Sequence, residues 1–255
     1  MQLIYRRKNP FSIEDPYRPK RPSTSKIIFL ACEGSATEEE YVEILSQIYD
    51  GVKNKVQLIS VAEDEIHTAP KGRTREQNQT LGKSKPWQLI ERIDKFKQEK
   101  EAIYEFSKYP EDQFWIVSDI DDNLNNHFQE FQKAISDCDE KGYKYAISNP
   151  FFEVWLLLHH DEVTEDDRKY AVTKGHPYEA TDHFRMRLSE KNVPLKDHKH
   201  LKMEDYSDEK IRIAVQRAKE LQLDSSEKYP KEYGTHVFKI VDEILTMLPQ
   251  GEREK

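Results

Sequence analysis

The sequence predicts an α/β fold in which helices flank a mostly parallel sheet and a helical extension follows. Short apolar runs typical of buried strands alternate with amphipathic segments of helical period from residue 26 to residue 160. Beyond residue 160 the strand pattern stops, whereas helical periodicity continues almost to the C-terminus. We therefore divide the chain into a basic, proline-rich N-terminal arm (1–25), an α/β core (26–160) and a helical C-terminal extension packed on the core (161–255).

The composition indicates a folded, soluble protein with a heavily charged surface. Of the 255 residues, 35% are charged, but 11 Phe, 13 Tyr and 3 Trp argue against disorder. The net charge of −8 provides no general attraction for nucleic acid, so such binding would need a local basic surface or a bridging metal. Two cysteines cannot form a disulfide framework, and no long apolar run is present. We expect a cytoplasmic protein that does not contact membranes.

Each element follows from its apolar pattern and from the residues at its ends. The predicted strands are 26–32, 56–61, 113–117 and 143–147, and the predicted helices are 37–49, 87–106, 126–141, 151–158, 182–191, 208–223 and 237–248. Pro86 opens the second helix at its first position. The helix at 126–141 is expected to turn Phe128, Phe131 and Ile135 inward.

Two helix starts carry specific local signals. At the first helix, Thr37 and Glu40 are expected to form a capping box, and Glu38 and Glu39 are interpreted as acids that complement the helix dipole. Before the helix at 151–158, the tripeptide Ser-Asn-Pro at 148–150 predicts an N-cap followed by a proline at the first helical position. That helix is apolar almost all round, which predicts burial.

Carboxylates follow two of the predicted strands. Glu33 ends the first strand, and Asp119, Asp121 and Asp122 follow the third. In a parallel sheet these ends share one edge, where ligands bind. Carboxylates this close repel each other unless a proton or a hard cation neutralises them, so we expect a Mg²⁺ or Mn²⁺ site. Glu153 is either a further acid linked to this site or a first-turn acid facing its helix dipole.

Basic residues suggest where phosphates could bind. The arm at 1–25 and the long loop at 62–85 are rich in Lys and Arg without apolar periodicity. The candidate nucleic-acid contacts are Lys71, Arg73, Arg75, Lys196, Lys199 and Lys202. The alternative is that these charges are simply solvated. The histidines lack the cysteine partners of a zinc site, and His159 would lie about 15 Å along its helix from the acidic edge.

Several segments resemble known families. Residues 27–37, Ile-Ile-Phe-Leu-Ala-Cys-Glu-Gly-Ser-Ala-Thr, with residues 118–122, Ser-Asp-Ile-Asp-Asp, resemble the Toprim domain, the Glu and Asp-x-Asp module of primases, topoisomerases and OLD-type nucleases. Residues 146–159, Ala-Ile-Ser-Asn-Pro-Phe-Phe-Glu-Val-Trp-Leu-Leu-Leu-His, are similar to the signature of the RloB-like family, bacterial Toprim proteins associated with defence and restriction loci. Residues 85–89 and 234–237 resemble the same family, so the similarity covers most of the chain from 26 to 248.

The resemblance implies a Toprim-like, Rossmann-like core with a metal-dependent nuclease site. It implies Glu33 as a general acid/base or metal ligand, Asp119 and Asp121 as metal ligands, and Asp122 as an accessory carboxylate. The residues of the longer signature that it marks as accessory are Ser148, Asn149 and Glu153. The family often has a basic residue between the two metal-binding aspartates, whereas Ile120 stands here, which keeps the ligands but removes one phosphate contact.

The functions implied are hydrolysis of DNA or RNA, tRNA among the candidates, in phage defence beside an ATPase partner. One alternative is a non-catalytic module that binds nucleic acid or an ATPase and keeps the acids as a structural cation site. Another is a haloacid-dehalogenase-type phosphatase, but a strand ending in Glu33-Gly34 precedes the Asp-x-Asp, and Asn123 stands where that fold needs Thr nearby. A parallel core with exposed helices permits a homodimer without requiring one.

Overall fold

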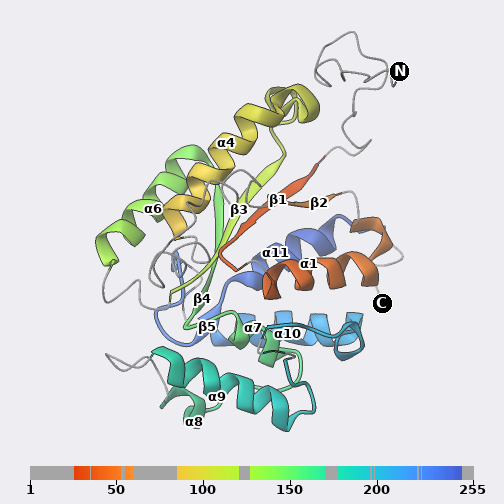
Figure 1. The fold of residues 1–255 in the computed structure, drawn as a ribbon, viewed down its shortest axis with the longest axis vertical. Helices are drawn as coiled ribbons and strands as arrows, with labels where there is room; N and C mark the ends of the chain where they lie inside the picture. The colour runs from red at the N-terminus through yellow and green to blue at the C-terminus, as the bar shows by residue number, and fades with distance from the viewer. Residues whose placement is uncertain are drawn as a thin grey trace, which may run out of the picture.

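The computed structural model of the chain describes residues 26–34, 36–52, 55–59, 85–120, 127–169, 177–195, 197, 199–222, 224 and 226–248. Its centre is a five-stranded sheet in the order β2-β1-β3-β4-β5 (Figure 1). The strands are β1 (Ile28–Cys32), β2 (Val56–Leu58), β3 (Gln113–Asp119), β4 (Lys144–Asn149) and β5 (Gly234–Thr235). The first four pair in parallel, and β5 runs antiparallel to β4. The predicted α/β class with a mostly parallel, Rossmann-like sheet is confirmed.

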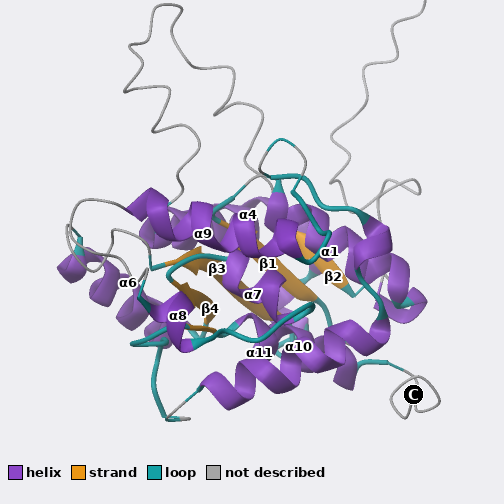
Figure 2. Ribbon diagram, turned by 90° about the horizontal axis from the view of Figure 1, so that it is seen from below, coloured by secondary structure: helices purple, strands orange, loops and turns teal. Residues whose placement is uncertain are grey.

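Helices cover both faces of this sheet. They are α1 (Thr37–Ile48), α4 (Pro86–Tyr104), α6 (Phe128–Lys141), α7 (Glu153–Leu158), α8 (Glu165–Arg168), α9 (Pro177–Glu190), α10 (Asp208–Leu221) and α11 (Val237–Thr246), with short 3₁₀ turns at Asp50–Val52, Phe106–Lys108 and Met203–Asp205. Helices α4 and α6 lie on one face and α1 and α11 on the other (Figures 1 and 2). Helices α7 and α10 lie below α1 and α11 in Figure 1, and α8 and α9 form the lower end.

The alternation of side chains along β1 explains the two layers. Ile28 and Leu30 pack in a large core with residues of α1, α7, α10 and α11, whereas Phe29 and Ala31 pack on the opposite face with residues of α4. Every residue of β1 is buried, which is why the strand reads as a continuous apolar run. The predicted burial of the apolar helix is also confirmed, since all six residues of α7 are buried.

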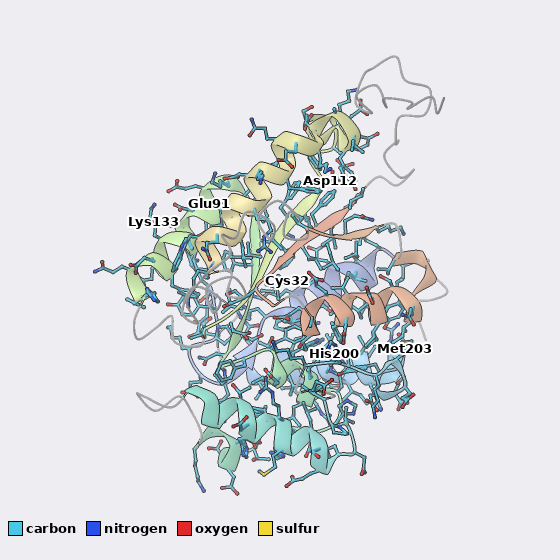
Figure 3. The ribbon with its side chains drawn as sticks, in the orientation of Figure 1. Cys32, Glu91, Asp112, Lys133, His200 and Met203 are labelled. Atoms are coloured by element: carbon cyan, nitrogen blue, oxygen red, sulfur yellow. The ribbon has the colours of Figure 1, made fainter. Side chains whose placement is uncertain are left out.

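The capping box predicted at the first helix is wrong. Ala36 is the N-cap of α1 and makes no side-chain capping bond. The Thr37 hydroxyl instead donates to the carbonyl of Lys199 at 2.9 Å, and the Glu40 carboxylate accepts from the Leu201 amide at 2.8 Å. His200 Nδ1 lies 2.5 Å from the same carboxylate, beside α1 in Figure 3. The two side chains therefore bind a distant segment rather than the helix start.

Two further predictions near helix starts are wrong. Phe128 is 43% exposed at the first position of α6, while Phe131 and Ile135 are buried as predicted. The tripeptide at 148–150 does not open a helix, because β4 extends through Asn149 and pairs with β5. The Asn149–Pro150 peptide bond is cis, and α7 begins three residues later at Glu153. The C-terminal part of the chain thus supplies a strand that its pattern did not predict.

Candidate acidic site at the edge of the sheet

The carboxyl ends of β1 and β3 bring Glu33 and Asp119 together. The two strands pair in register up to Cys32 and Val117, and the Glu33 amide then donates to the Val117 carbonyl at 2.9 Å. The Glu33 carboxylate reaches across to β3, where its Oε2 accepts from the Ser118 hydroxyl at 2.5 Å and from the Asp119 amide at 3.2 Å. Cys32, labelled in Figure 3, marks the end of β1 from which this contact starts. The shared edge expected from the strand order is therefore formed.

Glu38 and Glu153 add two more carboxylates, and we call Glu33, Glu38, Asp119 and Glu153 the acidic cluster. Glu38 is buried, its Oε1 accepts from the Gly34 amide at 3.2 Å, and it lines a small cavity of about 20 Å³ with apolar walls. Burial, followed by the charges of Glu153 and Glu33, raises the pKa of Glu38 to about 7. The interpretation of Glu38 as a simple first-turn acid is therefore incomplete.

Asp119 is subject to the charges of all three other members of the cluster. Burial raises the pKa of its carboxyl well above the ordinary value, and the charges of Glu33, Glu38 and Glu153 raise it further. A hydrogen bond from the Phe152 backbone amide lowers the pKa but offsets only part of the increase. The mutual effects on pKa place these carboxylates near one another in a desolvated environment.

Two arginines border the cluster. On α9, Arg185 donates from Nε at 3.0 Å and from Nη2 at 2.9 Å to the same oxygen of Glu153. The pKa of Glu153 is raised by burial despite this ion pair, which lowers it. On α4, Arg92 Nη1 donates to the carbonyl of Cys32 at 3.2 Å, at the end of β1. One arginine thus pairs with a member of the cluster, and a second contacts the residue before Glu33.

Ser148 and Asn149 take a structural position. The Ser148 hydroxyl is fully buried and lies 2.9 Å from the Thr235 hydroxyl, and the Asn149 amide donates to the Pro230 carbonyl at 3.0 Å. Both contacts attach the C-terminal segment to the end of β4. Of the three predicted accessory residues that the structure describes, Glu153 is the one at the acidic cluster.

The remaining predicted residues are either outside the described ranges or in other parts of the fold. Those outside the described residues are Asp121, Asp122, Lys71, Arg73, Arg75 and Lys196, and their roles stay predictions. Lys199 and Lys202 are exposed, in the segment that binds the start of α1. His159 is buried between the Tyr41 hydroxyl and the Trp155 carbonyl, each 2.9 Å away, and burial lowers its pKa to about 3. It is a neutral histidine of the core.

The chemistry of the cluster fits a hard cation. Carboxylate oxygens are the donors that Mg²⁺ and Mn²⁺ prefer, and a cation would offset the burial and the carboxylate charges that raise the pKa of Asp119. Within the described ranges, no group of three or more His, Cys, Asp or Glu side chains is arranged to hold a metal ion. Glu33 and Asp119 are the two predicted ligands that the structure describes, since the third, Asp121, lies outside these ranges.

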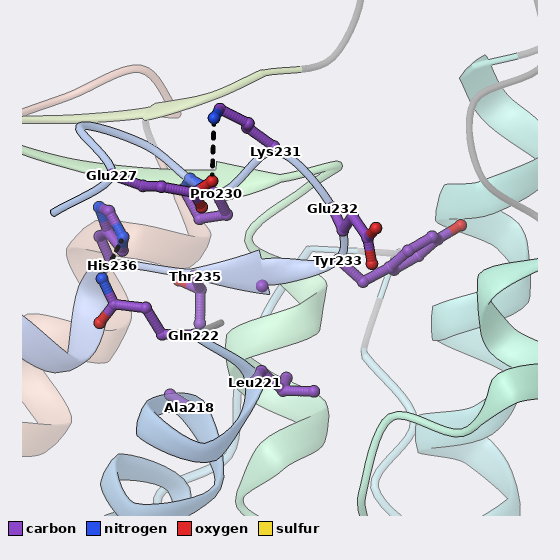
Figure 4. A pocket seen from close by; sticks show the side chains of 11 residues that line it. Ala218, Leu221, Gln222, Glu227, Pro230, Lys231, Glu232, Tyr233, Thr235 and His236 are labelled. Atoms are coloured by element: carbon purple, nitrogen blue, oxygen red, sulfur yellow. Dashed lines mark hydrogen bonds and ion pairs between the residues drawn. The ribbon is translucent and has the colours of Figure 1, made fainter. Parts of the chain in front are cut away.

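A separate cavity of about 140 Å³ lies beside β5 (Figure 4). Its walls come from the end of α10 and from residues 230–236, with the Glu227–Lys231 ion pair at 3.1 Å along one side. No residue of the acidic cluster lines this cavity. We therefore place the candidate site at the sheet edge.

Sequence reasoning missed three residues of the site. Ser118 had a signal, because it is a hydroxyl residue in an otherwise apolar strand. Glu38 had a weaker one, the glycine at position 34 that leaves room for its carboxylate. Arg185 had none, because it reaches Glu153 from a helix 32 residues away in the chain.

The fold and the site together define a class of protein: an α/β protein with clustered carboxylates at the carboxyl edge of a parallel sheet. A family model described as RloB-like protein matches residues 28–244, which is most of the chain. The chain belongs to the RloB-like protein family. No curated protein and no solved structure gave a significant match. Among the helices that the structure describes, none has the length and apolar character needed to cross a membrane.

Proposed function

We propose that this protein is a divalent-metal-dependent, Toprim-type nuclease that hydrolyses phosphodiester bonds of DNA or RNA in bacterial defence. The observation that carries the proposal is the contact of Glu33 with Ser118 and Asp119 across the ends of two adjacent parallel strands. Sheet edges of this kind are ligand sites, and clustered carboxylates are the ligand set used in metal-assisted phosphodiester hydrolysis. The resemblance of residues 27–37 and 118–122 to the Toprim domain implies the same chemistry.

The described residues prepare the site in two ways. Ser118 and the Asp119 amide fix the orientation of Glu33, and the Phe152 amide fixes Asp119. Burial keeps the carboxylates in a medium where charge interacts more strongly than in water. Mg²⁺ or Mn²⁺, bound by Glu33 and Asp119 with Asp121, would supply Lewis-acid polarisation of the phosphate and a more acidic water. Asp122 would add an accessory carboxylate.

We propose the partners of this protein from the family resemblance and from its basic residues. Nucleic acid is the substrate, with tRNA as one candidate, and the basic residues of the loop at 62–85 and of the segment at 196–202 are proposed phosphate contacts. An ATPase encoded nearby is the proposed protein partner. A homodimer is compatible with the exposed helices.

The first test is cleavage of supercoiled DNA, single-stranded DNA, total RNA and tRNA with Mg²⁺ or Mn²⁺, with and without the neighbouring ATPase. We expect wild-type protein to cut one class and Glu33→Gln to lose at least about 100-fold in rate, since the variant lacks the charge at the centre of the cluster. Glu43→Gln, which changes an exposed glutamate of α1, should cut like wild type.

Two outcomes would reverse this proposal. Undiminished cleavage by Glu33→Gln would show that the acidic cluster does not take part in the reaction. Binding of nucleic acid without turnover under every condition would favour the non-catalytic module with a structural cation site.

Gly34→Ala tests the contribution of Glu38. A Cβ at position 34 would lie 2.1 Å from Glu38 Oε2, so the flexible carboxylate must swing out of the cluster. We expect slower cleavage with little loss of stability, because the displaced carboxylate also leaves its like-charged neighbours. Gly142→Ala is the converse control, since Gly142 ends α6 at φ +69° with open space around it. That variant should lose roughly 1 kcal/mol of stability and keep full activity. Equal activity in Gly34→Ala and wild type would exclude a role for Glu38.

A further inference from the structure

Within the part of the chain that the structure describes, the Arg185 side chain is bound through Glu153 and is partly exposed. Both of its short contacts go to a single oxygen of Glu153, and Nη1 lies 3.9 Å from Asp182, beyond hydrogen-bond distance. The Arg185 side chain is 28% exposed, whereas that of Glu153 is 11% exposed. The guanidinium therefore pairs with a buried acid and still reaches solvent. Its planar set of five donors is not used up by one carboxylate oxygen.

Glu153 holds this guanidinium at the acidic cluster. The Phe152 backbone amide donates to the Asp119 carboxylate, and Glu153 is the next residue, at the start of α7, which places Glu153 beside Asp119. A phosphodiester that enters the cluster carries a negative charge toward four carboxylates and meets repulsion. A guanidinium at the rim would offset that repulsion, and its geometry matches two phosphate oxygens.

We propose that Arg185 binds the phosphate group of the nucleic acid at the acidic cluster, exchanging part of its contact with Glu153 for the phosphate oxygens. The inference rests on the proposed function and adds to it a substrate-binding residue from the C-terminal helices. Glu153 is then the residue that positions Arg185 while no substrate is bound.

The alternative is a purely structural ion pair, in which Arg185 only neutralises the buried Glu153. The two roles predict different effects for the partner residue. In a structural pair, removal of either member lowers the melting temperature and leaves substrate affinity alone. In a phosphate-binding role, Arg185→Gln weakens substrate binding, whereas Glu153→Gln frees the guanidinium and does not weaken it.

The experiment measures the Kd of a fluorescein-labelled single-stranded DNA and a labelled tRNA in Ca²⁺, with KM and kcat from the cleavage assay in Mg²⁺ or Mn²⁺. We expect Arg185→Gln to raise Kd and KM by about tenfold, Arg185→Lys to restore part of the loss, and Glu153→Gln to bind at least as tightly as wild type. Arg212→Gln is the control for loss of an ion-paired arginine, since Arg212 pairs with Asp208 on α10. Melting temperatures are recorded for all variants.

Unchanged Kd and KM in Arg185→Gln would overturn the inference, as would equal weakening in Arg185→Gln and Glu153→Gln. A failure of this inference can be distinguished from a failure of the proposed function, because binding and cleavage are measured separately. If Glu33→Gln still cleaves, the proposed catalytic site is wrong, while the Kd of Arg185→Gln still reports on the phosphate contact. If wild-type protein binds neither probe, alone or with the ATPase, both proposals are overturned.

Discussion

Asp119→Asn is expected to abolish metal-dependent cleavage while the protein stays at least as stable as wild type. The substitution removes an anionic ligand, so we expect cleavage to fall by about 100-fold or more. It also removes a buried charge whose pKa is raised by burial and by Glu33, Glu38 and Glu153. Because burial and the neighbouring charges disfavour the ionised form of Asp119, the unfolding free energy of the metal-free variant should be at least as high as that of wild type.

Thermal unfolding in EDTA and in Mg²⁺ or Mn²⁺, beside the cleavage assay, measures both effects. The cation should raise the melting temperature of wild-type protein and should do so much less for Asp119→Asn, because binding to the folded state alone stabilises it. Asp137→Asn, at a surface ion pair of α6, is the control and should match wild type in both assays. Retained metal-dependent activity in Asp119→Asn would refute the assignment of this carboxylate.

Asp167→Ala is expected to cause a large loss of stability, about 3–5 kcal/mol. The Asp167 side chain is 1% exposed and binds Arg187, His183 and Thr164, which joins α8 to α9. Its removal leaves the Arg187 guanidinium and the His183 ring, both largely buried, without this partner. Since α9 also carries Arg185, we expect weaker substrate binding in the same variant.

Denaturant unfolding of Asp167→Ala and wild type at pH 7 and pH 3 measures this loss and its origin. Burial alone would raise the pKa of Asp167, but the hydrogen bonds from Arg187, Thr164 and His183 lower it to about 2. A lowered folded pKa contributes stability above the ordinary value near 4, and this contribution is lost as the pH falls toward 2. The difference between the two proteins should therefore be smaller at pH 3.

The neighbouring residue provides a matched control for this prediction. Asp166 has a side chain that is 83% exposed and pairs with Lys169 at the surface. Asp166→Ala should change the unfolding free energy by less than about 1 kcal/mol, because exposed ion pairs contribute little. Similar losses in the two variants would show that the buried network is not what joins α8 to α9.

The parts of this protein that the sequence alone determined are those that depend on local pattern. The apolar runs of β1, β3 and β4 and the helical periods between them predicted the α/β core and the strand ends at Glu33 and Asp119. Parallel pairing then required these ends to share an edge, and the structure places the Glu33 carboxylate on the Asp119 amide. A segment that is buried along its whole length can be recognised from the sequence, because nearly every position in it is apolar.

Only the tertiary structure decided which polar groups meet. The local signals at Thr37 and Glu40 indicated a capping box. In the structure both side chains instead form hydrogen bonds with the backbone of residues 199–201, which are distant in the chain. The strand β5 consists of two residues, too few for a pattern, and it forms because β4 presents an open edge. Arg185 joins the acidic cluster from α9 for the same reason: hydrogen bonds and ion pairs depend on distance in space, which spacing along the chain does not specify.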